Sequence, residues 1–240
     1  MYTGMNYYGY GFDWTYLLVL AGAILSIWAS ARVNSTFQKY AKVRSMSGLN
    51  GAQVARMILD RNGLSDIPVE HVGGNLSDHY DPTKRVLRLS DSTYHSNSVA
   101  AIGVAAHECG HALQHKEGYG PLKLRSTIVP AANLGSRLGI PIILLGLFFG
   151  GGGSFLVKLG IWVFSLAVLF QIVTLPVEFN ASSRALAVLE GYGVLGQEEN
   201  KKAKKVLSAA AMTYVAAAAS SILQLLRLII LFGSRGSDRD

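Results

Sequence analysis

The chain has 240 residues, of which 50% are hydrophobic and 15% are charged, and its formal net charge is +7 at pH 7. An ordinary soluble domain carries about 25% charged residues, so this composition is typical of a membrane protein. The single cysteine, Cys109, excludes an internal disulfide and is expected to be a small buried side chain. The Lys and Arg residues gather beside apolar segments, which favours membrane flanks over a nucleic-acid-binding surface, so no nucleic acid partner is expected.

The first apolar segment, residues 14–30, is long enough with its flanks to cross a bilayer, and aromatic residues near its ends suit the membrane interfaces. We therefore predict an N-terminal transmembrane anchor over residues 1–32. A cleaved signal peptide would carry its basic residues before the apolar run, whereas here they follow it. The positive-inside rule then places the N-terminus outside and the next segment in the cytoplasm. The basic residues concerned are Arg32, Lys39, Lys42 and Arg44.

Residues 33–125 are predicted to form a cytoplasm-facing region with a small core and a small edge sheet. Residues 67–72 and 85–89 have the pattern of strands, and residues 77–82 between them have a turn-forming composition. His79 lies in this predicted turn. A turn histidine is most often simply exposed, but it is also a candidate for contacting a substrate.

The next segment, residues 104–115, has the sequence VAAHECGHALQH. On a helix, His107 and His111 project from the same face about one turn apart, so both imidazoles can hold one metal ion. The same helix places the carboxylate of Glu108 beside that ion, within reach of a metal-bound water that it can deprotonate. This is the H-E-x-x-H arrangement of zinc hydrolases.

Four specified positions also occur by chance in unrelated helices, whose histidines are ordinary core or surface side chains. The N-cap at residues 97–98, the small and apolar residues 99–106 and the glutamate favour a buried zinc helix here. A metzincin would need a third histidine six residues after His111, where the chain has Glu117, so that class is excluded. His115 is expected not to bind the metal and either to support the site or to be structural.

Two long apolar runs, residues 126–149 and 155–175, are joined by a glycine tract. They predict a transmembrane hairpin over residues 126–176, which returns the chain to the side from which it left. Whatever follows residue 175 therefore lies beside the zinc helix.

Residues 177–205 are predicted to form a helix that supplies the third metal ligand, followed by a basic segment. A zinc hydrolase normally takes three protein ligands and leaves the fourth position to water. Glu178, just after the returning span, is our candidate for the third ligand. Its rival, Glu190, lies close to a turn and is more typical of a surface carboxylate.

Residues 206–232 form a last apolar segment, which we predict to be a fourth span, and residues 233–240 form a polar tail. Arg227 argues against a span, because a charge in mid-bilayer is costly unless it is paired. A helix that packs over the protein core is the alternative.

Three blocks of the sequence resemble the bacterial YugP-type membrane zinc metallopeptidases, and the match covers nearly the whole chain. The blocks are LSDHYDP at residues 76–82, AIGVAAHECGHALQH at residues 101–115 and LPVEFNASSRA at residues 175–185. More distantly, the chain is similar to the HtpX-type membrane proteases, gluzincins whose third ligand is a glutamate after a membrane hairpin.

The resemblance implies that His107, His111 and Glu178 bind the metal and that Glu108 is the catalytic base. In the HtpX-type enzymes an aspartate four residues after the ligand glutamate supports a zinc histidine. Here that position is Ser182, so the residue that orients the histidine is left open.

The fold class expected is α+β and mostly α-helical, an integral membrane protein with a gluzincin-like zinc metalloprotease domain and a membrane hairpin. The function expected is a membrane endopeptidase with one Zn²⁺ per chain, in the bacterial plasma membrane, acting in processing or quality control of membrane proteins. We expect a peptide or protein substrate to add as a strand near Arg85–Leu89, taken as an edge strand. Stabilisation of the oxyanion is open among His79, Tyr214 and Arg184.

The alternative function is a non-catalytic membrane scaffold or binding protein that holds zinc structurally. Structural zinc sites are normally closed by four protein ligands, whereas only three convincing ones are found in the sequence. The sequence leaves the substrate and the oligomeric state open.

Overall fold

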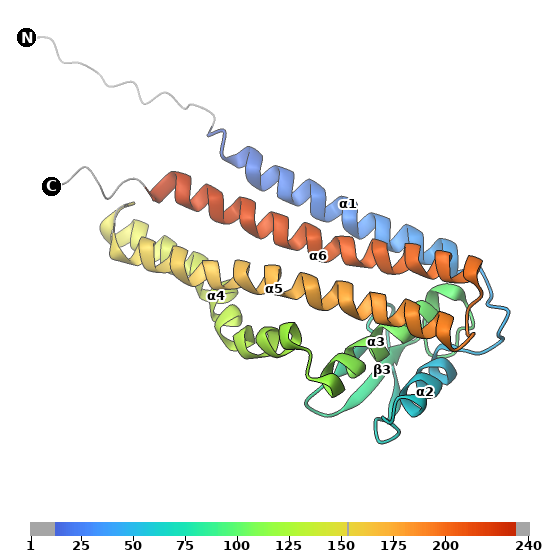
Figure 1. Ribbon diagram of the computed structural model, residues 1–240. Helices are drawn as coiled ribbons and strands as arrows, with labels where there is room; N and C mark the ends of the chain where they lie inside the picture. The colour runs from blue at the N-terminus through green and yellow to red at the C-terminus, as the bar shows by residue number, and fades with distance from the viewer. Residues whose placement is uncertain (1–12, 153, 234–240) are drawn as a thin grey trace, which may run out of the picture.

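The computed structural model describes residues 13–152 and 154–233. Three long helices, α1 (Tyr16–Ala41), α6 (Gln197–Phe232) and α5 (Phe155–Gly191), lie side by side with α6 in the middle (Figure 1). Helix α4 (Gly120–Gly150) packs against α5. The predicted polar tail, residues 233–240, lies outside the described residues except for Gly233.

These four helices are long and apolar enough to cross a membrane. The start of α1, the end of α6 and the connection between α4 and α5 all lie at one end of the bundle (Figure 1). Two shorter helices, α2 (Gly51–Arg61) and α3 (Val99–Glu117), gather with the sheet at the other end. The α+β, mostly helical fold predicted for an integral membrane protein is therefore confirmed.

The charge of Arg227, which argued against a span, is compensated by groups at the start of α1. Its guanidinium lies 3.5 Å from a carboxylate oxygen of Asp13, donates a hydrogen bond to Thr15 at 3.2 Å and stacks over the ring of Tyr16. A charge paired in this way is far less costly at a membrane boundary than an isolated one.

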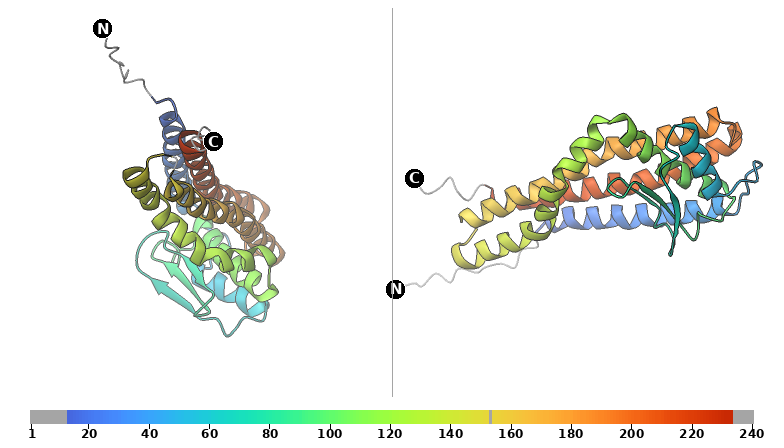
Figure 2. Two further views of the ribbon diagram at one scale, coloured as in Figure 1. Left: turned by 90° about the vertical axis from the view of Figure 1, so that its left-hand side faces the viewer. Right: turned by 90° about the horizontal axis from the view of Figure 1, so that it is seen from below.

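The hairpin of α4 and α5 is packed through glycines. A Cβ atom at Gly135 would lie 2.5 Å from the carbonyl oxygen of Val163, so only glycine allows the two backbones to approach this closely. Helix α4 contains Pro130 and Pro141 and bends along its length, as Figures 1 and 2 show. The bend carries its first turns away from α5 and over the end where α3 lies.

Helix α3 lies at the centre of the end of the bundle where α2 and the sheet gather, and it packs against α2, α5 and α6. It begins at the N-cap Ser98, whose hydroxyl accepts a hydrogen bond from the Ala101 N–H, and ends at Gly118 in the left-handed conformation. A Cβ atom at Gly110 would lie 2.5 Å from the carbonyl oxygen of Ala181, so this glycine lets α3 cross α5 in direct backbone contact. The segment with His107 and His111 is thereby pressed against α5, the second helix of the hairpin.

The sheet has the strand order β1-β3-β2. Strand β3 (Val86–Ser90) pairs in parallel with β1 (Val69–Val72) and antiparallel with β2 (His79–Asp81). The prediction that Arg85–Leu89 is an edge strand is therefore wrong, because this segment is the central strand and both of its sides are occupied. The segment predicted to be a turn instead contains β2, an edge strand.

Candidate metal centre

Three side chains from two helices converge where α3 crosses α5. The Oε2 atom of Glu178 lies 3.3 Å from Nε2 of His107 and 3.6 Å from Nε2 of His111. Glu178 is only 2% exposed, and its Oε2 atom has no hydrogen-bond partner among the residues that the structure describes. A buried carboxylate oxygen without a partner is costly, so this atom faces a place where a cation would stabilise it.

The spacing fits zinc. Ligand atoms about 2.0–2.1 Å from a tetrahedral zinc ion lie about 3.3 Å from one another, close to the two distances from Glu178. Over the described part of the chain, His107, His111 and Glu178 form the only group of three or more His, Cys, Asp or Glu side chains with metal-ligand spacing. Cys109 points away: its thiol donates to the carbonyl oxygen of Ala55, and burial raises the pKa of the thiol.

The orientation of each imidazole is set by a hydrogen bond at its other nitrogen. Nδ1 of His107 lies 3.1 Å from the hydroxyl of Ser182, and Nδ1 of His111 lies 3.0 Å from the amide oxygen of Gln114. The amide nitrogen of Gln114 donates to the carbonyl oxygen of Val177 and to Asn180, which fixes the orientation of the amide. Both rings are thereby held with Nε2 toward Glu178.

Ser182 therefore occupies the supporting place that the resemblance gives to an aspartate. Sequence reasoning missed Gln114, although a polar residue three positions after His111 lies on the same helix face, and this spacing was the available signal.

Glu108 lies between the three potential metal ligands and the sheet. It is 8% exposed, and its Oε2 atom accepts a hydrogen bond of 3.0 Å from the backbone N–H of Tyr80. That N–H of β2 therefore points away from β3, so the free edge of the sheet faces the metal centre. The hydroxyl of Tyr80 bonds with His115, which gives that histidine a supporting role on the sheet side of α3.

Two of the three candidates for stabilising an oxyanion point elsewhere. His79 is exposed and contacts the carbonyl oxygen of Ser77 and the side chain of Arg88, on the face of the sheet opposite to the Tyr80 ring. Arg184 donates hydrogen bonds of 2.7 Å to Glu117 and to Asn180. The polar atoms of both side chains are therefore engaged with groups other than the three potential metal ligands.

Two other side chains face the site. The phenol of Tyr214, the third candidate, lies beside the carboxylates of Glu178 and Glu108. Arg125, which sequence reasoning missed, places its guanidinium 3.4 Å from Oε1 of Glu178 and over the ring of Phe170. Arg125 reaches the site because the bend in α4 brings its first turns back toward α3.

Two imidazoles and a buried carboxylate with zinc spacing, set at one end of a bundle of apolar helices, define a membrane protein with a candidate zinc centre. The chain belongs to the family described as "Putative neutral zinc metallopeptidase", whose model matches residues 15–233. It is 52% identical over 215 residues to the "Putative membrane protease YugP" of Bacillus subtilis (strain 168), covering 90% of this chain and 95% of that protein. No solved structure matches the chain. The resemblance to the YugP-type family is thus confirmed, and the cofactor is zinc.

Proposed function

We propose that the protein is a zinc-dependent membrane endopeptidase in which His107, His111 and Glu178 hold the ion and Glu108 is the general base. The observation that carries the proposal is the buried Oε2 atom of Glu178, without a hydrogen-bond partner among the described residues and 3.3 and 3.6 Å from the two imidazoles. Two histidines and a glutamate leave a zinc ion one open position, which is the ligand set of catalytic sites.

Bound zinc would polarise the scissile carbonyl group and lower the pKa of a coordinated water toward neutrality. Glu108 takes the proton of the attacking water and delivers it to the leaving amine. The N–H of Tyr80 occupies one oxygen of Glu108 and fixes the plane of the carboxylate, so the other oxygen can carry the proton. Tyr214 and Arg125, which lie beside Glu178, are the donors proposed for the oxyanion.

The substrate is proposed to bind as an extended strand along the free edge of β2. The outward N–H of Tyr80 bonds with Glu108, which brings this edge beside the proposed base and leaves the other outward main-chain groups of β2 for the peptide. Main-chain hydrogen bonds to an edge strand bind peptides of many sequences, with specificity left to pockets for alternate side chains. This placement replaces the expected one at Arg85–Leu89, whose two sides are already paired.

The scaffold alternative requires a closed site with four protein ligands. Within residues 13–152 and 154–233, no fourth His, Cys, Asp or Glu side chain joins the group of three. The enzymatic function is therefore favoured.

Removal of zinc tests the function directly. The full chain, purified in neutral detergent, is expected to cleave an unfolded protein substrate, to lose this activity on chelation and to regain it when one equivalent of zinc is added back. Fragments mapped by mass spectrometry show whether cuts are internal, as an endopeptidase requires. Cleavage that survives complete loss of zinc would contradict the proposal.

Replacing Ser182 with alanine is expected to weaken zinc binding about tenfold, because the Nδ1 atom of His107 loses the hydroxyl that orients the ring. Competition with a chromogenic chelator measures the affinity. Ser183→Ala is the matched control, since its hydroxyl makes no hydrogen bond with either histidine, and it is expected to change the affinity less than about twofold. Equal affinities for Ser182→Ala and the control would show that another contact orients His107.

We also propose that the metal centre lies on the cytoplasmic side of the plasma membrane. The basic residues of the end of α1 and the start of α6 are at the same end of the bundle as α3, as the positive-inside rule requires. We propose the same division of the chain as the sequence predicts. It has an anchor at residues 1–32, a catalytic region at 33–125, a hairpin at 126–176, a ligand helix with a basic segment at 177–205 and a last span at 206–232.

A membrane-impermeant maleimide tests the orientation in intact cells. The native Cys109 is fully buried with a raised thiol pKa, so it is expected to stay unlabelled. Gly152→Cys, in the connection of the hairpin, is expected to be labelled from outside, and Lys84→Cys only after permeabilisation. The reverse pattern would contradict the orientation.

A further inference from the structure

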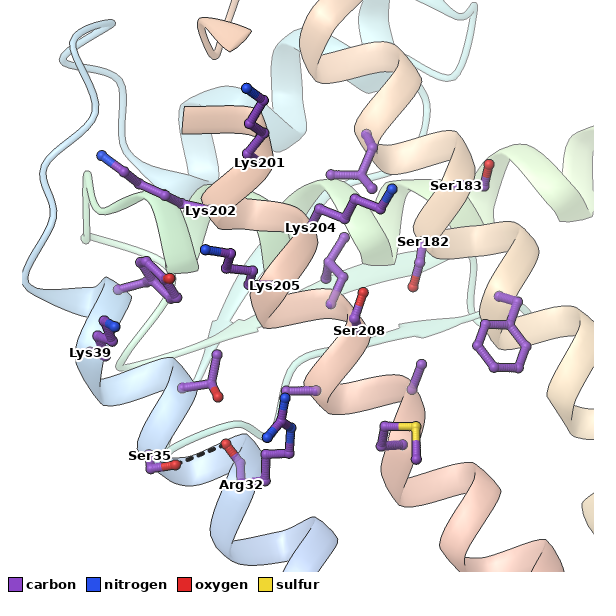
Figure 3. Close-up of a pocket in the computed structure, with 18 of the residues that line it drawn as sticks. Arg32, Ser35, Lys39, Ser182, Ser183, Lys201, Lys202, Lys204, Lys205 and Ser208 are labelled. Carbon is purple, nitrogen blue, oxygen red and sulfur yellow. Dashed lines mark hydrogen bonds between the residues drawn. The ribbon is translucent and has the colours of Figure 1, made fainter. Parts of the chain in front are cut away.

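A cavity of about 1070 Å³ lies between α1, α5 and α6, apart from the metal centre (Figure 3). Helix α6 contributes four lysines to it, and α1 contributes two further cationic side chains. Figure 3 shows these side chains around one hollow, with the serines of α5 on its other wall. The cationic residues that line the cavity are Arg32, Lys39, Lys201, Lys202, Lys204 and Lys205.

Most of this charge is not compensated by protein groups. Among the described residues, Lys201 is the only one of the six that forms an ion pair, with Glu198 at 2.7 Å. Arg32 and Lys39 stack over aromatic rings of their own helix instead. Several positive charges around one hollow create a strong positive potential, which favours a bound anion.

The rest of the lining suits a phosphate group attached to an apolar body. Hydroxyl groups of Ser183 and Ser208 line the cavity and can donate hydrogen bonds to phosphate oxygens, while Phe179 and Met212 give it an apolar part. Such a combination fits the head group and the first acyl carbons of a phospholipid better than it fits a fully polar anion.

The position of the cavity identifies the source of the phosphate. On α1 the apolar segment ends near residue 30, just before Arg32, and on α6 it begins at residue 206, just after Lys205. The cationic residues of the cavity therefore lie where α1 and α6 leave the apolar region. Phosphate groups of lipids lie at this depth, and basic pockets between membrane helices are typical sites for anionic head groups.

We propose that this cavity binds the phosphate group of an anionic phospholipid such as phosphatidylglycerol. Its lining includes Ser182, whose hydroxyl is 3.1 Å from Nδ1 of His107, so the lipid lies one side chain away from the metal centre. An acidic peptide is the other class of ligand that the charge would attract. The apolar part of the lining and the position at the end of the apolar segments favour the lipid.

The test measures lipid binding to the full chain in neutral detergent by native mass spectrometry. Phosphatidylglycerol is expected to bind at least about tenfold more tightly than phosphatidylcholine. The variant Lys39→Gln/Lys205→Gln, which removes one charge from each side of the cavity, is expected to lower the affinity for phosphatidylglycerol about tenfold. The control Lys42→Gln/Lys84→Gln removes two charges outside the cavity and is expected to change it less than about twofold.

Several results would overturn the proposal. Equal binding of the two lipids, or an equal loss in the control variant, would show that no specific site exists. Glycerol 1-phosphate that competes at the affinity of phosphatidylglycerol would identify a site for soluble phosphates, and polyglutamate binding alone would identify an acidic peptide site. An unchanged zinc content and an unchanged thermal unfolding temperature verify that each variant is folded. If Lys39→Gln/Lys205→Gln is not folded, Arg32→Gln replaces it in the test.

Discussion

The variant Glu108→Gln is expected to hydrolyse peptides about a thousandfold more slowly than the native protein, while it still binds one zinc ion per chain. The amide has the shape of the carboxylate and its oxygen can still accept the hydrogen bond from the Tyr80 N–H, so α3 and β2 keep their contact. It cannot, however, take a proton from water. The three proposed zinc ligands are unchanged, so the variant should keep its zinc content while it loses its peptidase activity.

Glu117→Gln is the matched control for this variant, because Glu117 is on the same helix and its carboxylate forms an exposed pair with Arg184. Exposed pairs contribute little, so its activity is expected to stay within about twofold of the native value. Initial rates on one fluorogenic peptide and zinc content by atomic emission measure both variants. Comparable cleavage by Glu108→Gln and the native protein would refute the role of Glu108 as the base.

The variant Glu178→Gln is expected to lose zinc. Loss of a residue that orients a metal ligand without touching the metal lowers metal affinity about 10- to 100-fold. Loss of a charged ligand should therefore lower the zinc affinity by more than about 100-fold. The neutral amide is a poor zinc ligand and leaves the two imidazoles without their charged partner. Peptide cleavage should fall in proportion to bound zinc.

Glu190→Gln tests the rival third ligand. Its carboxylate accepts a hydrogen bond from Asn200 and lies outside the group of potential metal ligands. This variant is expected to bind zinc and cleave peptides as the native protein does. Native zinc affinity in Glu178→Gln, together with loss in Glu190→Gln, would reverse the assignment.

The meeting of α3 and α5 could be predicted from the sequence because it depends on topology. Two apolar runs joined by a short connection must return the chain to the same side, which brings Glu178 back to the helix of His107 and His111. The sequence left the residue that orients His107 open, and the contact of Ser182 with that ring is consistent with its spacing from Glu178. Four residues after Glu178 it lies only about 40° further around the helix, whereas Arg184, six residues after, is rotated by about 240° and points elsewhere.

Other features depend on contacts that spacing does not define. Polar and apolar residues alternate over residues 85–89, as in a half-exposed strand. Strand β3 is nevertheless central, because β1 pairs with one of its sides and residues 79–81 pair with the other. Alternation reports which side chains are buried, and it says nothing about which strand edges are paired. Arg125 reaches Glu178 only because α4 bends, and neither the direction nor the extent of a bend follows from the presence of prolines.

We propose that the zinc is held by two imidazoles of α3 and one carboxylate of α5. Diffraction from crystals of the zinc-loaded protein at the zinc absorption edge locates the ion directly. One anomalous peak is expected within about 2.2 Å of Nε2 of His107, Nε2 of His111 and an oxygen of Glu178, with a non-protein ligand in the fourth position. A peak away from Glu178, or a fourth protein ligand that closes the site, would contradict it.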